Sequence, residues 1–323
     1  MPFNNVISRA DATALIPVET STEVIRSLAE TNPILQLARR LPNMSRYQKS
    51  IPVQNALATG YFVNGETGLK QTTDVSWTNV TLQAEEIAAI VPIPEQVLDD
   101  SEFDIWEQVR PNVVEALNVA VSGAVLYGTN IPASWTTALG AAGLFARATA
   151  AGSVVSNAAF ADTYEAIMGE SEAGVDGLLM TIEADGYMAT GHIASPAMRG
   201  RLRNVRDLNG VPLFVRSMQD STRYELDGAP IYFPTDGSIV DATSWMFSGD
   251  WTQLVYAMRQ DITYKVLTEA VIQDQSGNIV YNLAQQDMVA LRVVMRMAVA
   301  LPNPINRVNQ TAATRCPIAV LTA

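Results

Sequence analysis

The clearest hydrophobic pattern in the chain is a stripe of apolar residues spaced for one face of a helix. A loop is expected at Leu98–Ser101, before this helix. Asp104 stands three residues before Glu107, the spacing of an N-cap residue and its reciprocal partner, and Gly128 follows the last apolar position. The pattern predicts a helix of roughly 36 Å. Because Pro111 removes a backbone donor inside it, we expect a bend or a restarted helix there. The stripe recurs at intervals of three and four residues and consists of Ile105, Val109, Val113, Leu117, Ala120, Ala124 and Tyr127.

Alternating apolar and polar residues on both sides of a turn predict a long hairpin between Tyr47 and Pro94. Ile51 and Val53 begin the outgoing arm, residues 64–68 form the turn, and the return arm alternates strictly from Ile87 to Ile93. About 14 residues per arm at 3.3 Å each would carry the tip on the order of 45 Å. An isolated two-stranded hairpin is only marginally stable in water. We therefore expect it to rest on another subunit, and the alternative is a hairpin packed back on its own domain.

The chain before the hairpin has weaker patterns. Residues 1–20 have no strong period and predict an extended arm, with a frayed terminus as the alternative. Two short helices are expected next, at Thr22–Ala29 and at Pro33–Arg40, where a proline suits the first turn and Pro42 ends the second helix. An arm of this kind needs a surface to lie on.

The middle of the chain alternates between helical and strand patterns. We expect a compact α+β lobe here, because the segments are short and lie between turn residues. The expected segments are a loop with irregular strand at Thr129–Asn157, a helix at Ala158–Gly169, a buried strand at Leu178–Ile182, a short strand at His192–Ala194, a helix capped by Ser195 and ending at Asn209, a turn and strand at Leu226–Phe233 around Asp227 and Gly228, and a strand at Trp245–Phe247.

Almost all of the chain after Trp251 has a strand pattern. Leu254–Met258, Ile262–Leu267 and Met288–Leu301 are expected strands, and a short apolar end follows at Ile318–Leu321. Side chains of the longest strand alternate between two faces, so Arg292 and Arg296 fall on the same side. This predicts a sheet with one face on a core and the other facing solvent or a partner.

The net charge of -12, from 33 acidic and 21 basic residues, argues against a protein that reads DNA sequence. Affinity for nucleic acid comes largely from clustered Lys and Arg on phosphates. Only three basic residues are lysines, and arginine suits protein interfaces because it pairs with carboxylates in a planar, bidentate way. The most apolar run, Met288–Leu301, is interrupted by two arginines, so no membrane-spanning helix is expected. The N-terminus also lacks the pattern of a secretory signal.

Residues that could carry catalysis or bind a metal are sparse. His192 is the single histidine, which argues against a histidine-rich metal site or a catalytic triad. Cys316 is the single cysteine, and next to Pro317 it has no helix N-terminus to lower its pKa. No glycine-rich phosphate loop is present, and the neighbours Glu85 and Glu86 point to opposite faces of a strand. We therefore expect no catalytic residue, no bound metal and no cofactor.

The order of these elements resembles the major capsid proteins of tailed double-stranded DNA phages, which share the Hong Kong 97-like fold. The local matches occur in the family order and span nearly the whole chain from about Ala29. They are "VPIPEQVLDDSEFDIWEQV", "AVLYGTN", "SPAMRGRLRNVRDLNGVPLF", "LDGAPIYFPT", "FSGDWTQLVYAMRQDITYKV" and "MVALRVVMRMAVALPNPINRV". The resemblance implies an α+β fold with an N-terminal arm, an extended β-hairpin loop, a long spine helix, a peripheral domain and an axial domain.

The resemblance also implies a division of the chain into parts. These would be an arm with short helices (1–46), the extended loop hairpin (47–93), the spine helix of the peripheral domain (94–132), the axial domain (133–258), the peripheral-domain sheet (259–309), and a C-terminal tail (310–323) that could return to the axial domain.

The implied function is that of a shell subunit forming the pentamers and hexamers of an icosahedral head. The head would enclose double-stranded DNA without sequence-specific binding, and an acidic inner wall would not trap that DNA. Portal, scaffolding or decoration proteins are further implied partners, and the implied location is the virion, assembled in the host cytoplasm. The residues expected at subunit interfaces are Arg39, Arg40, Tyr61, Phe62, Glu66, Lys70, Trp77, Arg292 and Arg296.

Two departures from the family pattern qualify this expectation. Some family members carry a long N-terminal scaffold segment that is cleaved, whereas the arm begins almost at Met1, so we expect a separate scaffolding protein or none. Some members also join a loop lysine to a neighbour's asparagine with the help of a glutamate. Lys70 lies in the matching loop and Asn303 or Asn306 in a suitable region, but no matching glutamate is found.

Two other functions stay open at the level of sequence. An encapsulin-type nanocompartment shell would have the same fold and a cargo pocket, and particles holding an enzyme in place of DNA would favour it. An α+β enzyme of unknown reaction is the alternative from another class. A stable monomer with no tendency to assemble would favour the enzyme.

Overall fold

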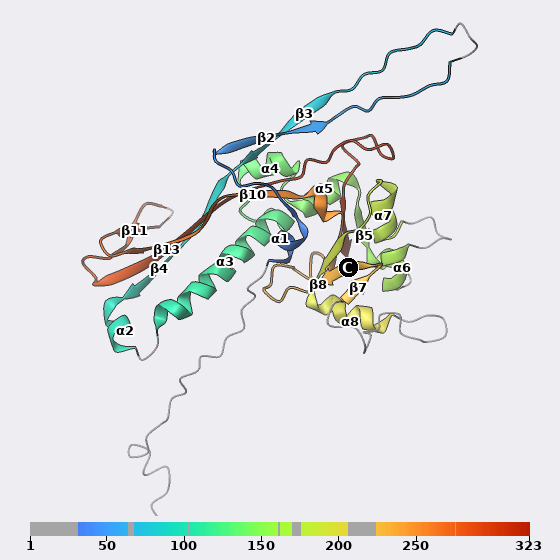
Figure 1. Cartoon of the computed structure of the whole chain (residues 1–323). Helices are drawn as coiled ribbons and strands as arrows, with labels where there is room; N and C mark the ends of the chain where they lie inside the picture. The colour runs from blue at the N-terminus through green and yellow to red at the C-terminus, as the bar shows by residue number, and fades with distance from the viewer. Residues whose placement is uncertain are drawn as a thin grey trace, which may run out of the picture.

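The computed structural model describes residues 32–63, 68–101, 104–160, 162–169, 176–205, 224–274 and 276–323. It has two lobes connected by a long helix, and a hairpin projects beyond them (Figure 1). The helices are α1 (Pro33–Leu37), α2 (Glu95–Asp100), α3 (Ile105–Tyr127), α4 (Ala133–Leu139), α5 (Leu144–Ala151), α6 (Thr163–Met168), α7 (Leu178–Ala184) and α8 (Pro196–Asn204), with 3₁₀ turns at Asn157–Ala159 and Trp251–Gln253. The strands are β1 (Arg39–Arg40), β2 (Gln48–Gln54), β3 (Trp77–Gln83), β4 (Glu85–Pro94), β5 (Val154–Ser156), β6 (Gly191–Ala194), β7 (Tyr224–Leu226), β8 (Ala229–Tyr232), β9 (Met246–Gly249), β10 (Val255–Leu267), β11 (Val271–Gln273), β12 (Ile279–Asn282), β13 (Met288–Ala300) and β14 (Ile318–Thr322).

Helix α3 is the predicted long helix. The Asp104 carboxylate accepts hydrogen bonds from the backbone N–H groups of Trp106 at 2.9 Å and Glu107 at 3.3 Å, which confirms the predicted N-cap. Gly128 ends the helix with φ at 72°, in the left-handed region. Most of the predicted stripe packs inward, but Ala120 is exposed. Near the C-terminus of α3, the buried face of the helix includes Val121 and leaves Ala120 in solvent.

Pro111 does not interrupt this helix, so the predicted restart is wrong. Pro111 removes only one backbone hydrogen-bond donor, and this residue lies in the second turn of α3. Glu107, one turn earlier, is exposed to water. The Asn112 side chain also donates a hydrogen bond to the Gln108 carbonyl at 2.9 Å, which supports the same turn. Hydration of this turn and the hydrogen bond from Asn112 together offset the loss of the backbone donor at Pro111.

The lobe that contains α2 and the start of α3 is built on a four-stranded sheet with the order β1-β10-β13-β4. Val113 and Leu117 of α3 pack against Leu291 and Val293, on one face of the central strand β13. The two strands expected at 254–267 form a single strand, β10, with register shifts around Gln260. A register shift of this kind interrupts the alternation of side chains, which explains why the sequence pattern divides there.

Strand β4 belongs to this sheet and not to the hairpin. Residues 85–94, which we expected to continue the hairpin's return arm, pair antiparallel with β13 from Met288↔Pro94 to Met297↔Glu85. The hairpin ladder ends at Gln48↔Gln83. The alternation at residues 85–94 does mark a strand. The partner of this strand is β13, which lies about 200 residues away in the chain, as the paired residues show.

The second lobe is built on a six-stranded sheet with the order β5-β14-β9-β6-β8-β7. The apolar chain end at Ile318–Leu321 is a strand, β14, which lies between the edge strand β5 and β9 and pairs with both. The expected short strands around His192 and Phe247 are β6 and β9. The turn at Asp227 and Gly228, with both φ values positive, connects β7 to β8 as predicted.

Several short segments differ from the expectation. Leu178–Ile182 is the start of helix α7 and not a strand, because a short apolar run looks alike in a buried strand and a buried helix turn. The expected loop at Thr129–Asn157 contains helices α4 and α5, which end at Gly140 and Gly152, so alanine acts there as a helix former. The expected helix at Ala158–Gly169 is shorter, with Asp162 as its N-cap.

Three further expectations concern the ends of elements. The loop expected at Leu98–Ser101 is largely helix α2. The helix expected at Pro33–Arg40 ends at Leu37, and Arg39 and Arg40 form strand β1 beside β10 instead. The helix capped by Ser195 ends at Asn204 and not at Asn209, because Val205 already has an extended backbone conformation. The arm and the helix at Thr22–Ala29 lie outside the described residues.

Candidate subunit interface

The base of the hairpin packs on its own chain. Ile51, Val80 and Leu82 lie against Ala298 and Ala300, on the face of β13 opposite to helix α3. Alanine at these two positions lets the hairpin strands approach the sheet closely. The indole N–H of Trp135 in α4 donates to the Gln83 carbonyl at 3.2 Å, which ties the end of β3 to the body.

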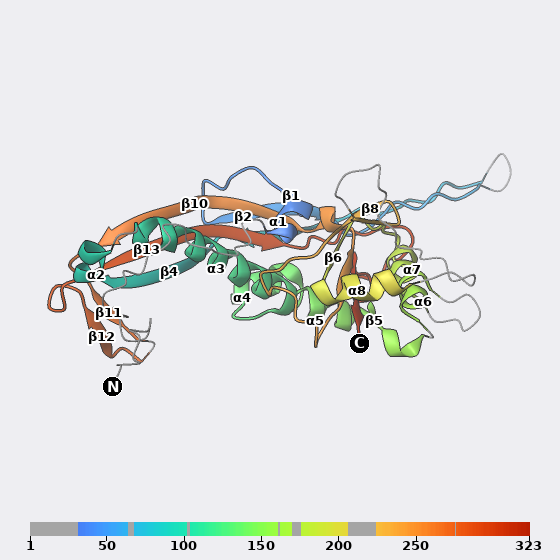
Figure 2. The ribbon, with the colours of Figure 1, turned by 90° about the horizontal axis from the view of Figure 1, so that it is seen from below.

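The outer part of the hairpin leaves the body of the protein. Figures 1 and 2 show this loop extending away from both lobes. Past the ladder, the two arms stay together through few contacts: the N–H of Asn55 donates to the Ser76 carbonyl at 2.9 Å, the N–H of Thr59 to the Thr73 hydroxyl at 2.9 Å, and the Tyr61 hydroxyl to the Gln71 carbonyl.

Large apolar side chains are exposed along this loop. Phe62 is fully exposed, Leu69 is 91% exposed and Trp77 is 68% exposed, while Tyr61 keeps 42% of its surface in solvent. Exposed apolar residues are ordinary when scattered, but several of them on an unsupported loop indicate a contact surface. Tyr61, Phe62 and Trp77 are thus accessible in the single subunit, and their place at a subunit interface stays a prediction. Glu66 lies outside the described residues.

The segment after β13 supports the start of this loop. The N–H of Ile305 donates to the Gln54 carbonyl at 3.2 Å, and the Arg307 guanidinium donates to the Ala58 carbonyl at 2.7 Å. These contacts set the direction in which the loop leaves the body. Sequence reasoning missed Arg307 and Leu69, because a charge on a loop and an apolar residue near a turn have no period to reveal them.

The basic residues expected at interfaces fall into two groups. Arg39 and Arg40 are exposed on β1, and Arg40 donates to the Asn43 side chain at 3.3 Å. Arg292 and Arg296 lie on one face of β13, as predicted. Arg292 is exposed, whereas Arg296 forms an ion pair with Glu86 on β4.

The asparagines considered for a crosslink with Lys70 take part in a network inside the chain. The Asn303 side chain donates to the Arg315 carbonyl at 3.0 Å and accepts from the Tyr187 hydroxyl at 2.9 Å. The Asn306 side chain donates to the Asp185 carbonyl at 2.7 Å. Lys70 is exposed in the projecting loop. The structure does not bring Lys70 together with either asparagine within one chain.

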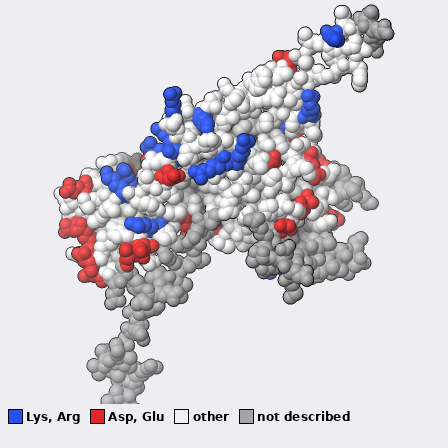
Figure 3. Space-filling view, in the orientation of Figure 1, with Lys and Arg blue, Asp and Glu red and all other residues white. Residues whose placement is uncertain are grey.

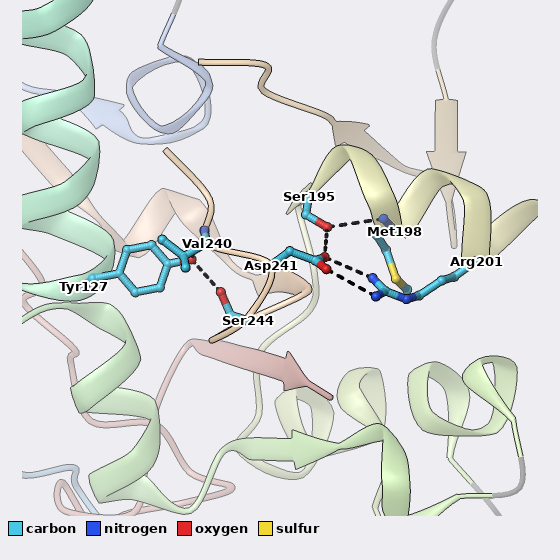
Figure 4. A network of polar contacts seen from close by, with 7 residues as sticks. All are labelled: Tyr127, Ser195, Met198, Arg201, Val240, Asp241 and Ser244. Carbon is cyan, nitrogen blue, oxygen red and sulfur yellow. Dashed lines mark hydrogen bonds and ion pairs between the residues drawn. The ribbon is translucent and has the colours of Figure 1, made fainter. Parts of the chain in front are cut away.

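A second polar network fastens the loop between β8 and β9 to two helices (Figure 4). The Arg201 guanidinium in α8 donates to both carboxylate oxygens of Asp241, at 3.0 and 3.3 Å, and the Ser195 hydroxyl donates to the same carboxylate at 2.5 Å. The hydrogen bonds from Arg201 and Ser195 lower the pKa of Asp241. Tyr127 at the end of α3 accepts from the Val240 N–H at 3.0 Å and contacts the Ser244 hydroxyl at 2.6 Å. The loop thus links the spine of one lobe to α8 of the other.

The titratable side chains expected to be structural are buried and bonded. His192 is fully buried, its Nε2 lies 3.0 Å from the Leu226 carbonyl, and burial lowers its pKa. Burial raises the pKa of the Cys316 thiol to about 11, so this thiol is poorly reactive. Glu85 accepts from the Ser134 hydroxyl at 2.7 Å on the face opposite to the Glu86 ion pair.

A cleft of about 510 Å³ lies between α3, β4 and the loop at 237–240. Its acidic residues are Glu85 and Glu86, which are engaged as described. Across the described ranges, no three His, Cys, Asp or Glu side chains come together as a metal site. No helix in the described part of the chain is both long and apolar enough to cross a membrane.

Comparisons with known proteins agree over nearly the full length. The model of the family described as "Phage capsid family" matches residues 12–306. The Major capsid protein of Staphylococcus phage 80alpha is 24% identical over 300 residues, covering 91% of this chain and 84% of that protein. A solved structure from Microbacterium phage Oxtober96 is 32% identical with a TM-score of 0.81, covering 98% of this chain and 99% of that one. One from Mycobacterium phage Bobi is 27% identical with a TM-score of 0.78, covering 98% and 99%. The chain therefore belongs to the phage capsid family, with the Hong Kong 97-like fold of tailed-phage major capsid proteins.

Proposed function

We propose that this chain builds the head of a tailed phage by assembling into pentamers and hexamers, with its extended hairpin lying over a neighbouring copy. One observation carries the proposal: the hairpin is anchored at its base by Ile51, Val80 and Leu82, but it presents Phe62 and Leu69 to solvent far from its own core. Burial of such side chains is favourable by roughly 1.5–3 kcal/mol each. A neighbouring copy supplies the missing surface.

The chain's role in this proposal is structural and involves no catalysis. Each copy contributes contacts of about 800 Å² per partner, so the shell gains stability from the number of contacts. The enclosed double-stranded DNA is held without sequence-specific binding, which fits the net charge of -12. Assembly takes place in the host cytoplasm, and portal, scaffolding or decoration proteins join the shell of the virion.

In this proposal the two lobes have different positions in the capsomer. The lobe with the six-stranded sheet surrounds the capsomer axis, and the lobe with β10, β13 and α3 forms the periphery. The joint made by Tyr127 and the loop at 240–244 supports this division, because it fixes the end of α3 to the neighbouring lobe.

The test is to express the chain, alone and with its scaffolding protein if one exists, and to separate the product by sedimentation. We expect closed particles. DNA in particles purified from infected cells supports the phage head, whereas a cargo enzyme would favour the nanocompartment. A chain that remains a 34.9 kDa monomer under all assembly conditions contradicts the proposal.

A further inference from the structure

An irregular segment connects the two sheets of the protein. This connecting segment, residues 302–316, runs from the end of β13 to the start of β14 and forms neither helix nor strand. Its backbone turns at Asn303, where φ is 46°, in the left-handed region. Backbone without regular structure depends on hydrogen bonds to other parts of the chain. The partners of the connecting segment therefore show what holds it in place.

One side of the connecting segment contacts the start of the long hairpin. The N–H of Ile305 donates to the carbonyl of Gln54, the last residue of β2, at 3.2 Å. The Arg307 guanidinium donates to the Ala58 carbonyl at 2.7 Å, beyond the end of the ladder. The projecting loop carries few charged side chains of its own (Figure 3). The charged contact that fixes its direction comes from the connecting segment.

The other side of the connecting segment is fastened to Asp185, at the end of helix α7 in the lobe with the six-stranded sheet. Its carboxylate accepts from the Asn309 side chain at 2.7 Å through Oδ1 and from the Cys316 N–H at 2.8 Å through Oδ2. Its backbone carbonyl accepts from the Asn306 side chain at 2.7 Å. Asp185 is only 9% exposed, so losing one of these bonds would leave a buried polar group without its partner.

The end of α7 and the connecting segment also pack closely. Gly186 follows Asp185 with φ at 81°, and a Cβ built there would come within 2.8 Å of the Cβ of Val308. Val308 lies directly between Arg307 and Asn309 in the chain. The part of the segment that contacts the hairpin is therefore the part that lies against α7.

The interior of the connecting segment is bonded to itself. Arg315 is 2% exposed, and its guanidinium donates to the carbonyls of Asn303 and Asn309, both at 2.9 Å. Arg147 in α5 donates to the Arg315 carbonyl at 2.9 Å, which holds the end of the segment near β14. A contiguous network of this kind transmits a displacement from one of its contacts to the next. A change at Asp185 is therefore passed on to the hairpin.

We propose that Asp185 is a positioning residue for the long hairpin: it fixes the connecting segment, which in turn sets the direction of the hairpin through Arg307. This deepens the proposed shell function and rests on it, because the direction of the hairpin decides where its exposed side chains meet a neighbouring copy. Asp185 is buried and acts only through the segment. The hairpin, whose base packs on the four-stranded sheet, is thereby coupled to the other lobe as well.

The test measures the direction of the hairpin in the full-length, dissociated subunit, as the distance between two spin labels. The substitutions Gly60→Cys and Ala197→Cys supply the attachment points, one just past Ala58 and one on α8. A Cβ at Gly60 meets no atom within 4 Å, and Ala197 is exposed. The native Cys316 thiol is buried and its pKa is raised to about 11, so it takes up no label at neutral pH. We expect a single narrow distance distribution for this labelled chain.

Two variants break the proposed link at its two ends. Asp185→Asn places an amide N–H group against one of the two donors, and Arg307→Met removes the guanidinium from an exposed position where the fold does not depend on it. Each should at least double the width of the distance distribution. The double variant should widen it no further, because both substitutions act on one link. An unchanged distribution in Arg307→Met, which keeps the buried network intact, would overturn the proposal.

Asp241→Asn is the matched control. It removes a carboxylate from the same lobe, but the partners of Asp241 are Ser195 and Arg201, in and before α8. Its distance distribution should stay as narrow as that of the unaltered labelled chain. Broadening equal to that in Asp185→Asn would show a general loosening of the lobe and would overturn the positioning role.

Sedimentation and electron microscopy of the unlabelled variants connect the link to assembly. We expect Arg307→Met to form several-fold fewer closed particles of uniform size than the unaltered chain. Uniform particles at the unaltered yield, despite a broadened distance distribution, would overturn this proposal and leave the shell function intact. An unaltered chain that never assembles would overturn the shell function, and with it the role of the link in assembly, whatever the labels show.

Discussion

At the scale of single residues, the long hairpin has its most exposed apolar side chains beyond the paired strands. Phe62 and Leu69 contribute nothing to the fold of their own chain, since both are more than nine-tenths exposed. Exchanging them should therefore act on association and leave the stability of the subunit unchanged. A substitution at a residue that stabilises the fold would reduce both association and the stability of the subunit.

The double variant Phe62→Ser/Leu69→Ser should lose particle formation, because each side chain gives up roughly 1.5–3 kcal/mol of burial at every copy of the contact. Sedimentation measures the assembled fraction, and thermal melting of the dissociated subunit should show no change. Met188→Ser is a suitable control, since Met188 is 73% exposed on the other lobe. Normal assembly of the hairpin variant would contradict the assigned role of the loop.

Asp241 holds the loop between β8 and β9 through Arg201 and Ser195. Asp241→Asn removes the charge and should lower the free energy of unfolding by about 1 kcal/mol at pH 7, the scale expected for a partly exposed ion pair. The pKa of Asp241 is lowered in the folded chain, so this stabilisation is present above the ordinary carboxyl range and is lost as the pH falls below about 4. Urea unfolding of the dissociated subunit at several pH values measures it. A difference between the two proteins that is as large at pH 3 as at pH 7 would be the contrary result.

Residue-level prediction from the sequence succeeded where a residue type has one strong preference. The N-cap at Asp104 and the helix end at Gly128 belong to this group. Arg296 was grouped with Arg292 by the alternation of the strand, but Glu86 became its partner through a strand pairing that only the folded chain reveals. The ion pair between Arg201 and Asp241 had no signal for the same reason, since it joins residues 40 positions apart.

At the scale of elements, the end of α3 depends on a close crossing of backbones. Gly128 lies against the turn before α5, and a Cβ built at Gly128 would come within 2.3 Å of the Ala142 carbonyl oxygen. A Cβ at Gly143 would come within 2.5 Å of the Gly128 backbone nitrogen. Two glycines therefore allow the spine helix and the α5 segment to meet.

Gly128→Ala should destabilise the dissociated subunit by more than about 2 kcal/mol, because it adds a clash with backbone to the strain of left-handed φ. Gly152→Ala is the matched control. Gly152 also ends a helix at positive φ, 82°, but a Cβ there meets no atom within 4 Å, so only about 1 kcal/mol should be lost. Chemical unfolding of both variants gives the comparison. Equal losses would show that the crossing does not matter.

Elements with a long period were predictable, and short apolar segments were not. The 23 residues of α3 give many repeats of the pattern, and both of its ends carry capping residues. Leu178–Ile182 is too short to separate a period of two from one of 3.6, and its helical state depends on packing in the second core with Ile167 and Met198. The pairing of β4 with β13 in place of β2 also depends on tertiary contacts, since alternation identifies a strand but not its neighbour.

At the scale of the whole molecule, the two lobes and the projecting loop give the subunit a shape that suits packing beside copies of itself in a shell. Each lobe has its own sheet, and α3 together with the loop fixed by Tyr127 and Asp241 holds them as one body (Figure 4). Among the described residues, large apolar side chains are exposed on the loop that carries Phe62 and on the hairpin of β11 and β12 that carries Ile279. Both project from the body, which is what a subunit surrounded by copies of itself requires.

The most direct test of this account is a cryo-electron microscopy reconstruction of particles assembled from the expressed chain. We predict a closed icosahedral shell of pentamers and hexamers in which density for Phe62 and Leu69 lies against a neighbouring copy. A map in which the loop lies back on its own subunit, or a preparation that contains only dispersed 34.9 kDa monomers, would contradict it.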